Sequence, residues 1–132
     1  MEERVTISSS TTEIAKVESL IDKVCESNNF SEDNYGNVLI AVTEAVNNAI
    51  EHGNLNVQEK QVTINCVYDK NVLRFSVKDE GRGFDFNNLP DPTDPENLEK
   101  PNGRGIFLMR NLADKVEFSE NGSKVDIEFV VE

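Results

Sequence analysis

Apolar residues recur every three or four positions in two segments near the start of the chain, which is the spacing of an amphipathic helix. The first segment follows Ser10 and Glu13, a pair typical of a capping box, and predicts a helix that ends at about Ser27. The second begins after Ser31, and Gly53 fits the residue that follows its last turn. The apolar residues of the second helix are Tyr35, Val38, Leu39, Val42, Ala45, Val46, Ala49 and Ile50.

Apolar and polar residues alternate in several other segments, which predicts strands with one buried face. Val5 and Ile7 mark a short first strand. Two alternating runs on either side of Asp69-Lys70-Asn71 predict a β-hairpin, and two later runs predict another hairpin across the tight-turn dipeptide Asn121-Gly122. The alternating apolar residues of the hairpins are Val62, Ile64, Cys66, Tyr68, Leu73, Phe75, Val77, Val116, Phe118, Val125, Ile127, Phe129 and Val131.

The segment between the two hairpins combines a loop with a short helix. Residues 84–102 contain all 4 prolines and little periodicity, which is typical of a functional loop or a lid. The apolar spacing of residues 106–113 predicts a third helix. The order β-α-α-β-β-loop-α-β-β, with short turns between neighbouring strands, predicts an α+β fold. We expect a two-layer α/β sandwich, in which a mainly antiparallel mixed sheet of about five strands carries three helices on one face.

Length and charge narrow the functional classes. The chain has 132 residues, which favours a single domain, and its 13 basic and 25 acidic side chains give a net charge of −12. Such a surface repels phosphate backbones and anionic lipid, so we expect no nucleic-acid partner and no membrane partner. The N-terminus lacks a signal-peptide pattern, and we expect Cys25 and Cys66 to be buried free thiols. These features predict a cytoplasmic location.

The second helix carries the first candidate for chemistry. Glu44, Asn48 and His52 are spaced i, i+4, i+8 and fall along one flank of its apolar stripe. A carboxylate and an amide on one line can position a nucleophile and bind a hydrated cation. A solvated helix face would show the same spacing, so these residues alone leave both interpretations open.

Two glycine pairs are the next candidates. Asp79-Glu80-Gly81-Arg82-Gly83 follows directly on a predicted strand, where glycines let the backbone approach a ligand and the aspartate can accept a hydrogen bond from a base amine. Gly103-Arg104-Gly105 opens the third helix, whose free N–H groups would favour an anion. Each pair alone also fits a plain turn. Neither extends to G-x-G-x-x-G and no P-loop pattern is present, which excludes Rossmann, P-loop and eukaryotic-type kinase sites.

The three segments, taken in this order, resemble the ATP-binding fold shared by gyrase, Hsp90, histidine kinases and MutL, the GHKL superfamily. Residues 44–53 are similar to its N box in the form E-x-x-x-N-A-x-x-H-G, residues 79–83 to its D-x-G-x-G box, and residues 103–105 to its second glycine box. The small size and the run from Gly103 to Met109 are most similar to the bacterial anti-sigma-factor serine protein kinases. The likeness spans roughly residues 5 to 131.

The resemblance implies a role for each matching residue. Glu44 corresponds to the catalytic base, Asn48 to the Mg²⁺ ligand and Asp79 to the residue that reads adenine, with residues 84–102 as the ATP lid. For His52 we favour a structural role as a hydrogen-bonding group at the helix end. The remaining nucleotide contacts implied by the family are Gly81, Gly83, Gly103, Arg104, Gly105 and Ser123, where the family usually has Thr at the last position.

The resemblance also implies a function. It predicts an ATP-dependent serine protein kinase that acts as an anti-sigma factor, phosphorylates a STAS-type anti-sigma-factor antagonist and sequesters a sigma factor, with ATP and Mg²⁺ as cofactors and a homodimer as its assembly. A nucleotide-gated binding module without kinase activity and a simple ATPase, or a histidine-kinase fragment, are the alternatives. The same residues serve phosphate transfer to serine and to water, so the sequence leaves the acceptor open.

One feature of the charge distribution stands apart from the resemblance. Residues 79–99 contain seven acidic side chains and one basic side chain, Arg82. This segment cannot hold a triphosphate by its own charge. We therefore expect the anion to be held by Mg²⁺, by backbone N–H groups and by the neighbouring Lys100 and Arg104.

Overall fold

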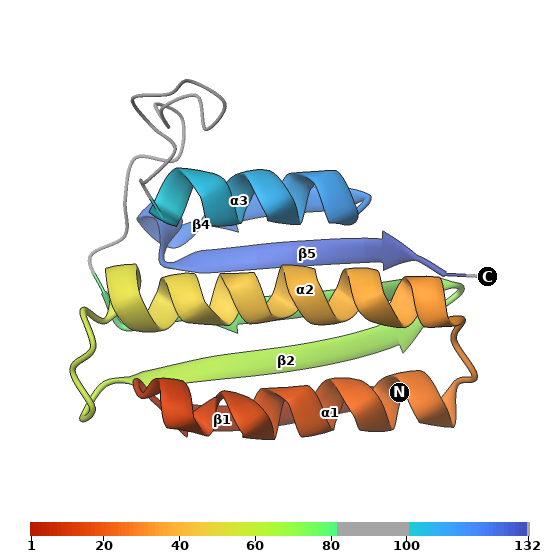
Figure 1. Cartoon of the computed structure of the whole chain (residues 1–132), viewed down its shortest axis with the longest axis horizontal. Helices are drawn as coiled ribbons and strands as arrows, with labels where there is room; N and C mark the ends of the chain where they lie inside the picture. Colours follow the sequence, from red (N-terminus) through yellow and green to blue (C-terminus); the bar gives the residue numbers. More distant parts are fainter. Residues whose placement is uncertain (82–100, 132) are drawn as a thin grey trace.

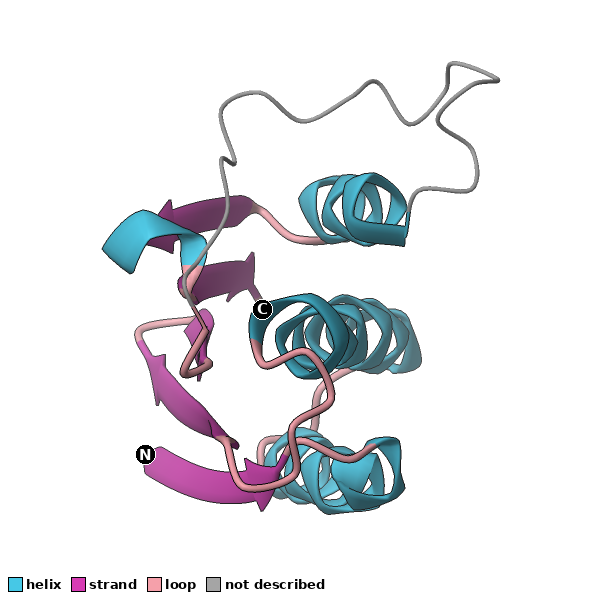
Figure 2. Ribbon diagram, turned by 90° about the vertical axis from the view of Figure 1, so that its left-hand side faces the viewer, coloured by secondary structure: helices cyan, strands magenta, loops and turns pink. Residues whose placement is uncertain are grey.

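The computed structural model describes residues 1–81 and 101–131, and these form one sheet with three helices in front of it (Figure 1). Figure 2 shows the same two layers edge-on, with the strands on one side and the helices on the other. This arrangement confirms the predicted α+β two-layer fold. The elements in chain order are β1 (Glu2–Ser8), α1 (Ile14–Ser27), α2 (Glu32–Asn48), β2 (Gln61–Asp69), β3 (Val72–Lys78), α3 (Pro101–Leu112), β4 (Lys115–Ser119) and β5 (Lys124–Val130).

The five strands have the order β1-β2-β3-β5-β4, and each neighbouring pair is antiparallel. The hairpin between β2 and β3 closes where Asp69 pairs with Val72. The two residues between them, Lys70 and Asn71, have φ values of 50° and 67°. Two successive left-handed residues form the type I′ turn, whose twist matches that of the flanking strands. The first predicted hairpin is therefore confirmed together with its turn.

The second hairpin exists, but its connection is longer than predicted. Ser119 of β4 pairs with Lys124 of β5, so four residues join the strands and Asn121-Gly122 does not form a two-residue turn. Glu120, with φ 51°, begins a 3₁₀ turn that ends at Gly122, with φ 93°. The Ser123 hydroxyl donates to the Glu120 carbonyl at 2.8 Å and closes the loop. Side-chain bonding of this kind overrides the dipeptide preference.

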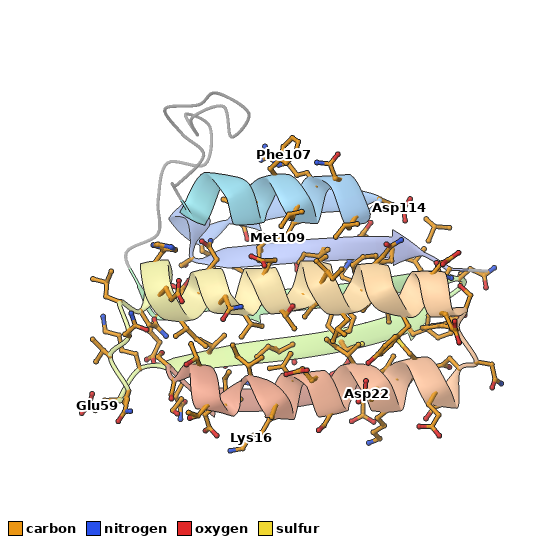
Figure 3. The ribbon with its side chains drawn as sticks, viewed as in Figure 1. Lys16, Asp22, Glu59, Phe107, Met109 and Asp114 are labelled. Atoms are coloured by element: carbon orange, nitrogen blue, oxygen red, sulfur yellow. The ribbon has the colours of Figure 1, made fainter. Side chains whose placement is uncertain are left out.

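Helix α2 lies in the centre of the helical layer, between α1 and α3 (Figure 1). Figure 3 shows the two sides of α3: Met109 points toward α2, whereas Phe107, which is 42% exposed, points away from it. The helices cover the inner sheet face, where every second strand residue is buried as predicted. The largest fully buried side chains are Phe75, Ile7, Ile21, Ile50, Ile64, Leu73, Ile106, Met109, Ile127, Val17, Val24 and Val38.

Two helix starts differ from the prediction. Ser10 caps a 3₁₀ turn over Thr11–Glu13 instead of a capping box, and α1 begins at Ile14. Helix α3 begins at Pro101, before the apolar spacing of residues 106–113 that predicted it, and the second glycine pair lies within its first turns. A proline suits the first helical position because its fixed φ is helical and its missing N–H has no partner there in any helix.

The two cysteines are buried and free, as predicted. Burial raises the pKa of the Cys25 thiol to about 11 and that of the Cys66 thiol to about 12, so both are protonated at neutral pH. Within residues 1–81 and 101–131, none of the helices combines the length and the apolar character that a membrane span requires.

The core predicts a clear contrast between two substitutions on adjacent strands. Phe75→Ala removes a ring that is 0% exposed and should lower the free energy of unfolding by about 3–5 kcal/mol. Val130→Ala trims a side chain that is 54% exposed and should change it by less than about 0.5 kcal/mol. Urea unfolding followed by circular dichroism measures both, and similar losses would contradict the described burial.

Candidate functional site

The first part of the site lies where the end of α2 and the start of α3 meet at one end of the molecule (Figure 1). Glu44 is half-buried on α2, and Gly105 is buried on α3. A Cβ atom added at Gly105 would lie 3.2 Å from Glu44 Oε2. The structure therefore brings the carboxylate of the first motif against the second glycine pair, although 60 residues separate them in sequence.

Asn48 lies one turn after Glu44 on α2 and is half-buried. After it the helix changes to a π turn over Ala49–Gly53, in which the Asn54 N–H donates to the Ala49 carbonyl at 2.8 Å. The regular 100° spacing that aligned His52 with Glu44 ends here, because a π turn holds more residues than an α turn. Turns of this kind inside a helix occur frequently at functional sites.

One ring nitrogen of His52 lacks the hydrogen bond that the sequence suggested. Its Nε2 atom is buried and has no hydrogen-bond partner among the described residues. Glu51 Oε2 lies 3.9 Å from this nitrogen. The expected hydrogen bond at the helix end is therefore not seen at this nitrogen.

The second part of the site is the turn after β3. Asp79 is only 7% exposed, and its Oδ1 accepts the Gly81 N–H at 2.7 Å. Gly53 packs directly on this carboxylate, so that a Cβ atom at Gly53 would overlap it, and a Cβ atom at Gly81 would overlap the Gly53 carbonyl. Neither glycine is among the residues with positive φ. Gly53 ends the helical segment as the last residue of the π turn, and its lack of a side chain permits the close approach to Asp79.

Ser123 is brought to the same turn through its backbone. Its carbonyl accepts the Asp79 N–H at 2.9 Å, while its hydroxyl donates to the Glu120 carbonyl. The Ser123 carbonyl therefore holds the backbone of Asp79 in place.

Electrostatics distinguish Asp79 from an ordinary surface carboxylate. Burial raises the pKa of the Asp79 carboxyl above its ordinary value, while the Gly81 N–H and the positive charge of Lys60 act in the opposite direction. A buried carboxylate whose pKa is raised by desolvation is a typical feature of binding sites.

For some of the predicted site residues, the structure describes only the backbone or does not describe the residue. Gly103 and Arg104 belong to the first turn of α3, where free N–H groups collect. Gly83 and most of the expected lid over residues 84–102 lie outside the described residues, which resume at Pro101. Of the predicted site residues, the structure describes Glu44, Asn48, Asp79, Gly81, Gly103, Arg104, Gly105 and Ser123, with the backbone alone at positions 103 and 104.

The donor set fits a nucleotide with Mg²⁺. The Asn48 amide and the Glu44 carboxylate offer oxygen atoms on neighbouring turns of one helix, and Mg²⁺ prefers one or two such ligands together with phosphates and waters. Among the described residues, no group of three or more His, Cys, Asp or Glu side chains could hold a metal ion by itself.

One residue at this end of the molecule was not identified from the sequence. Asn54 is fully buried, and its Oδ1 accepts the Glu80 N–H at 2.7 Å. A single asparagine after a predicted helix carries no pattern that would single it out, because its partners come from distant strands.

The close approach at Gly53 predicts opposite effects for two glycine substitutions. Gly53→Ala places a methyl group against Asp79 and should lower the free energy of unfolding by about 1–3 kcal/mol. Gly36→Ala is the control within α2: its Cβ meets nothing within 4 Å, and it should raise stability by about 0.5–1 kcal/mol. Urea titrations of both variants measure these shifts, and a neutral Gly53→Ala would refute the packing described.

The raised pKa of Asp79 predicts that Asp79→Asn increases the free energy of unfolding, by an amount that depends on pH. In wild type the unfolded chain ionises Asp79 more readily than the folded chain, so stability is lost as the pH rises from about 3.9 through the raised pKa. Asparagine keeps an acceptor for the Gly81 N–H without a charge. The variant should therefore be more stable than wild type at pH 7, with the difference vanishing at low pH. Thermal unfolding from pH 3.5 to 8 tests this, and a pH-independent difference would contradict it.

Comparison with known proteins places this geometry in a family. A family model described as a histidine kinase-like ATPase domain matches residues 7–129. The chain is 31% identical over 94 residues to the serine-protein kinase RsbW of Bacillus cereus (strain AH820), and 32% identical over 95 residues to that of Bacillus cereus (strain AH187). Each alignment covers 67% of this chain and 58% of the relative, so the chain spans less than two thirds of the length of these relatives.

A solved structure has the same fold. The crystal structure of the RsbU and RsbW domains of Rv1364c from Mycobacterium tuberculosis matches with a TM-score of 0.72 at 14% sequence identity, over 99% of this chain and 32% of that chain. The arrangement of sheet and helices is therefore a known one. Because the family model covers nearly all of the sequence, the chain belongs to the histidine kinase-like ATPase domain family.

Proposed function

We propose that this chain is a single ATP-binding domain that acts as a serine protein kinase, with ATP and Mg²⁺ as cofactors. The observation that carries the proposal is the close approach of Glu44 to the N-terminal part of α3, where a Cβ atom added at Gly105 would lie 3.2 Å from Glu44 Oε2. A carboxylate one turn away from the free N–H groups of a helix start combines a proton acceptor with an anion site, which is what phosphate transfer requires.

The reaction assigns Glu44 the role of base. Glu44 accepts the proton of the serine hydroxyl while the serine oxygen forms a bond to the γ-phosphorus, and the bond between that phosphorus and the β,γ-bridging oxygen breaks to release ADP. Asn48 would hold Mg²⁺ through its amide oxygen, and the ion would neutralise charge on the phosphate oxygens.

The other residues bind the nucleotide. Asp79 accepts a hydrogen bond from the exocyclic amine of adenine, and its burial excludes the water that would compete for this bond. Arg104, in the first turn of α3, is the proposed neighbour of the phosphates. The remaining contacts that we propose are backbone contacts at Gly81, Gly83, Gly103 and Gly105 and a contact with the hydroxyl of Ser123.

The proposed substrate is a protein. The relatives named serine-protein kinase support a serine acceptor, and the net charge of −12 favours a protein partner over a nucleic acid. We propose that the acceptor is a STAS-type anti-sigma-factor antagonist and that the same chain, as a homodimer, sequesters a sigma factor. Transfer of phosphate to water alone would make it an ATPase, and nucleotide binding without transfer would make it a gated binding module.

The decisive variant is Glu44→Gln, which keeps the size of the side chain but cannot accept the proton. We expect calorimetry to give Mg-ATP affinities for wild type and variant within about threefold, whereas transfer of labelled γ-phosphate to the partner serine should fall by about 10²–10⁴-fold. Glu32→Gln, an exposed change at the other end of α2, is the control and should keep wild-type transfer. Wild-type transfer in Glu44→Gln would remove Glu44 as the base, and absence of nucleotide binding in wild type would overturn the function.

A further inference from the structure

Asn54 is the buried centre of a hydrogen-bond network at the proposed nucleotide site. Its side chain is 0% exposed, and each of its polar groups has a partner. Nδ2 donates to Ser9 Oγ at 2.7 Å and to the Gln61 carbonyl at 3.0 Å, while Oδ1 accepts the Glu80 N–H at 2.7 Å. A fully satisfied polar group of this kind fixes its surroundings in one arrangement.

The partners determine the orientation of the amide. The Gln61 carbonyl can only accept and the Glu80 N–H can only donate, so Nδ2 must face the former and Oδ1 the latter. Ser9 Oγ donates to the Lys60 carbonyl at 2.7 Å, which leaves its oxygen free to accept from Nδ2. A carboxylate or an aliphatic side chain at position 54 would leave at least one of these buried groups without a partner.

The network joins segments that are far apart in the chain. Ser9 follows β1, Gln61 begins β2, and Glu80 follows β3. The connection from Asn54 to β2, in which Figure 3 labels Glu59, lies at the end of the molecule where α3 begins. Asn54 itself follows Gly53, so it ties the end of the π turn to three ends of strands.

The bond to Glu80 bears directly on Asp79. Glu80 stands between Asp79 and Gly81, and Gly53 stands next to Asn54. The bond from Glu80 N–H to Asn54 Oδ1 therefore holds the Asp79–Gly81 turn against the π turn. The carboxylate of Glu80 adds a second tie, because it accepts the Gln61 N–H. Together they keep the Asp79 carboxylate close to Gly53 and Gly81.

We propose that Asn54 is a positioning residue for nucleotide selectivity: it holds the Asp79–Gly81 turn and so sets the preference for adenine without touching the nucleotide. The inference rests on the proposed function, since it assigns Asp79 to adenine. A residue that only stabilised the fold would affect all nucleotides alike. A residue that orients the Asp79 carboxylate affects the affinity only for nucleotides whose base carries an amine at C6.

The test compares Mg-ATP with Mg-ITP, whose base carries oxygen in place of that amine. We expect wild type to prefer ATP, and Asn54→Ala to lose about tenfold or more of the ATP-to-ITP affinity ratio while binding ITP as wild type does. Ser9→Ala is the matched control: it also removes a bond of Asn54 but leaves the bond to Glu80, so it should keep the wild-type ratio. Calorimetry on all three proteins gives the ratios.

Asn54→Asp covers the case in which Asn54→Ala does not fold. Its carboxylate keeps an acceptor for the Glu80 N–H and loses the donors to Ser9 and Gln61, so the ratio should stay near that of wild type although stability falls. The positioning role alone would be overturned if folded Asn54→Ala kept the wild-type ATP-to-ITP affinity ratio. It would also be overturned if this ratio fell about tenfold in Ser9→Ala or in Asn54→Asp. A wild type that binds neither nucleotide would overturn the proposed function and this inference with it.

Discussion

The arrangement of this site depends on a steric constraint: the π turn after α2 and the turn after β3 approach so closely that each has one position with no room for a side chain. Gly53 ends the π turn against the Asp79 carboxylate, and Gly81 lies against the Gly53 carbonyl. Glycine is the residue that permits such contact. A third glycine, Gly105 on α3, similarly lies close to Glu44 on α2.

The site is built at an energetic cost to the fold. Asp79 is buried, and desolvation raises its pKa without a salt bridge among the described residues to offset it. Position 53 holds a glycine within a helical turn, which is locally unfavourable. Binding sites commonly carry such costs, and the surrounding core has to compensate for them. Here the core beneath α2 includes Ile50 and Val46, both fully buried, immediately before the site.

The hydrogen bonds around Asn54 complete this construction. Packing at glycines defines how near the segments can come, but it does not fix their relative rotation. Directional bonds from one buried amide do so, because each bond has a preferred geometry. A polar centre of this kind also connects β1 to the proposed nucleotide site through Ser9.

The sequence by itself determined the helices, the strands, their order and the motif residues, because the periods of apolar residues and the turn preference of Lys70-Asn71 act locally. It did not determine the longer loop at Asn121-Gly122, the start of α3 at Pro101 or the close approach of Gly53 to Asp79. Side-chain hydrogen bonds and contacts with distant segments decide these features. It also gave no sign of Asn54, whose three side-chain partners, Ser9, Gln61 and Glu80, lie on segments that only the folded chain brings together. Tertiary structure alone decided which carboxylate is buried and what holds it, since desolvation and close approach are properties of neighbours in space.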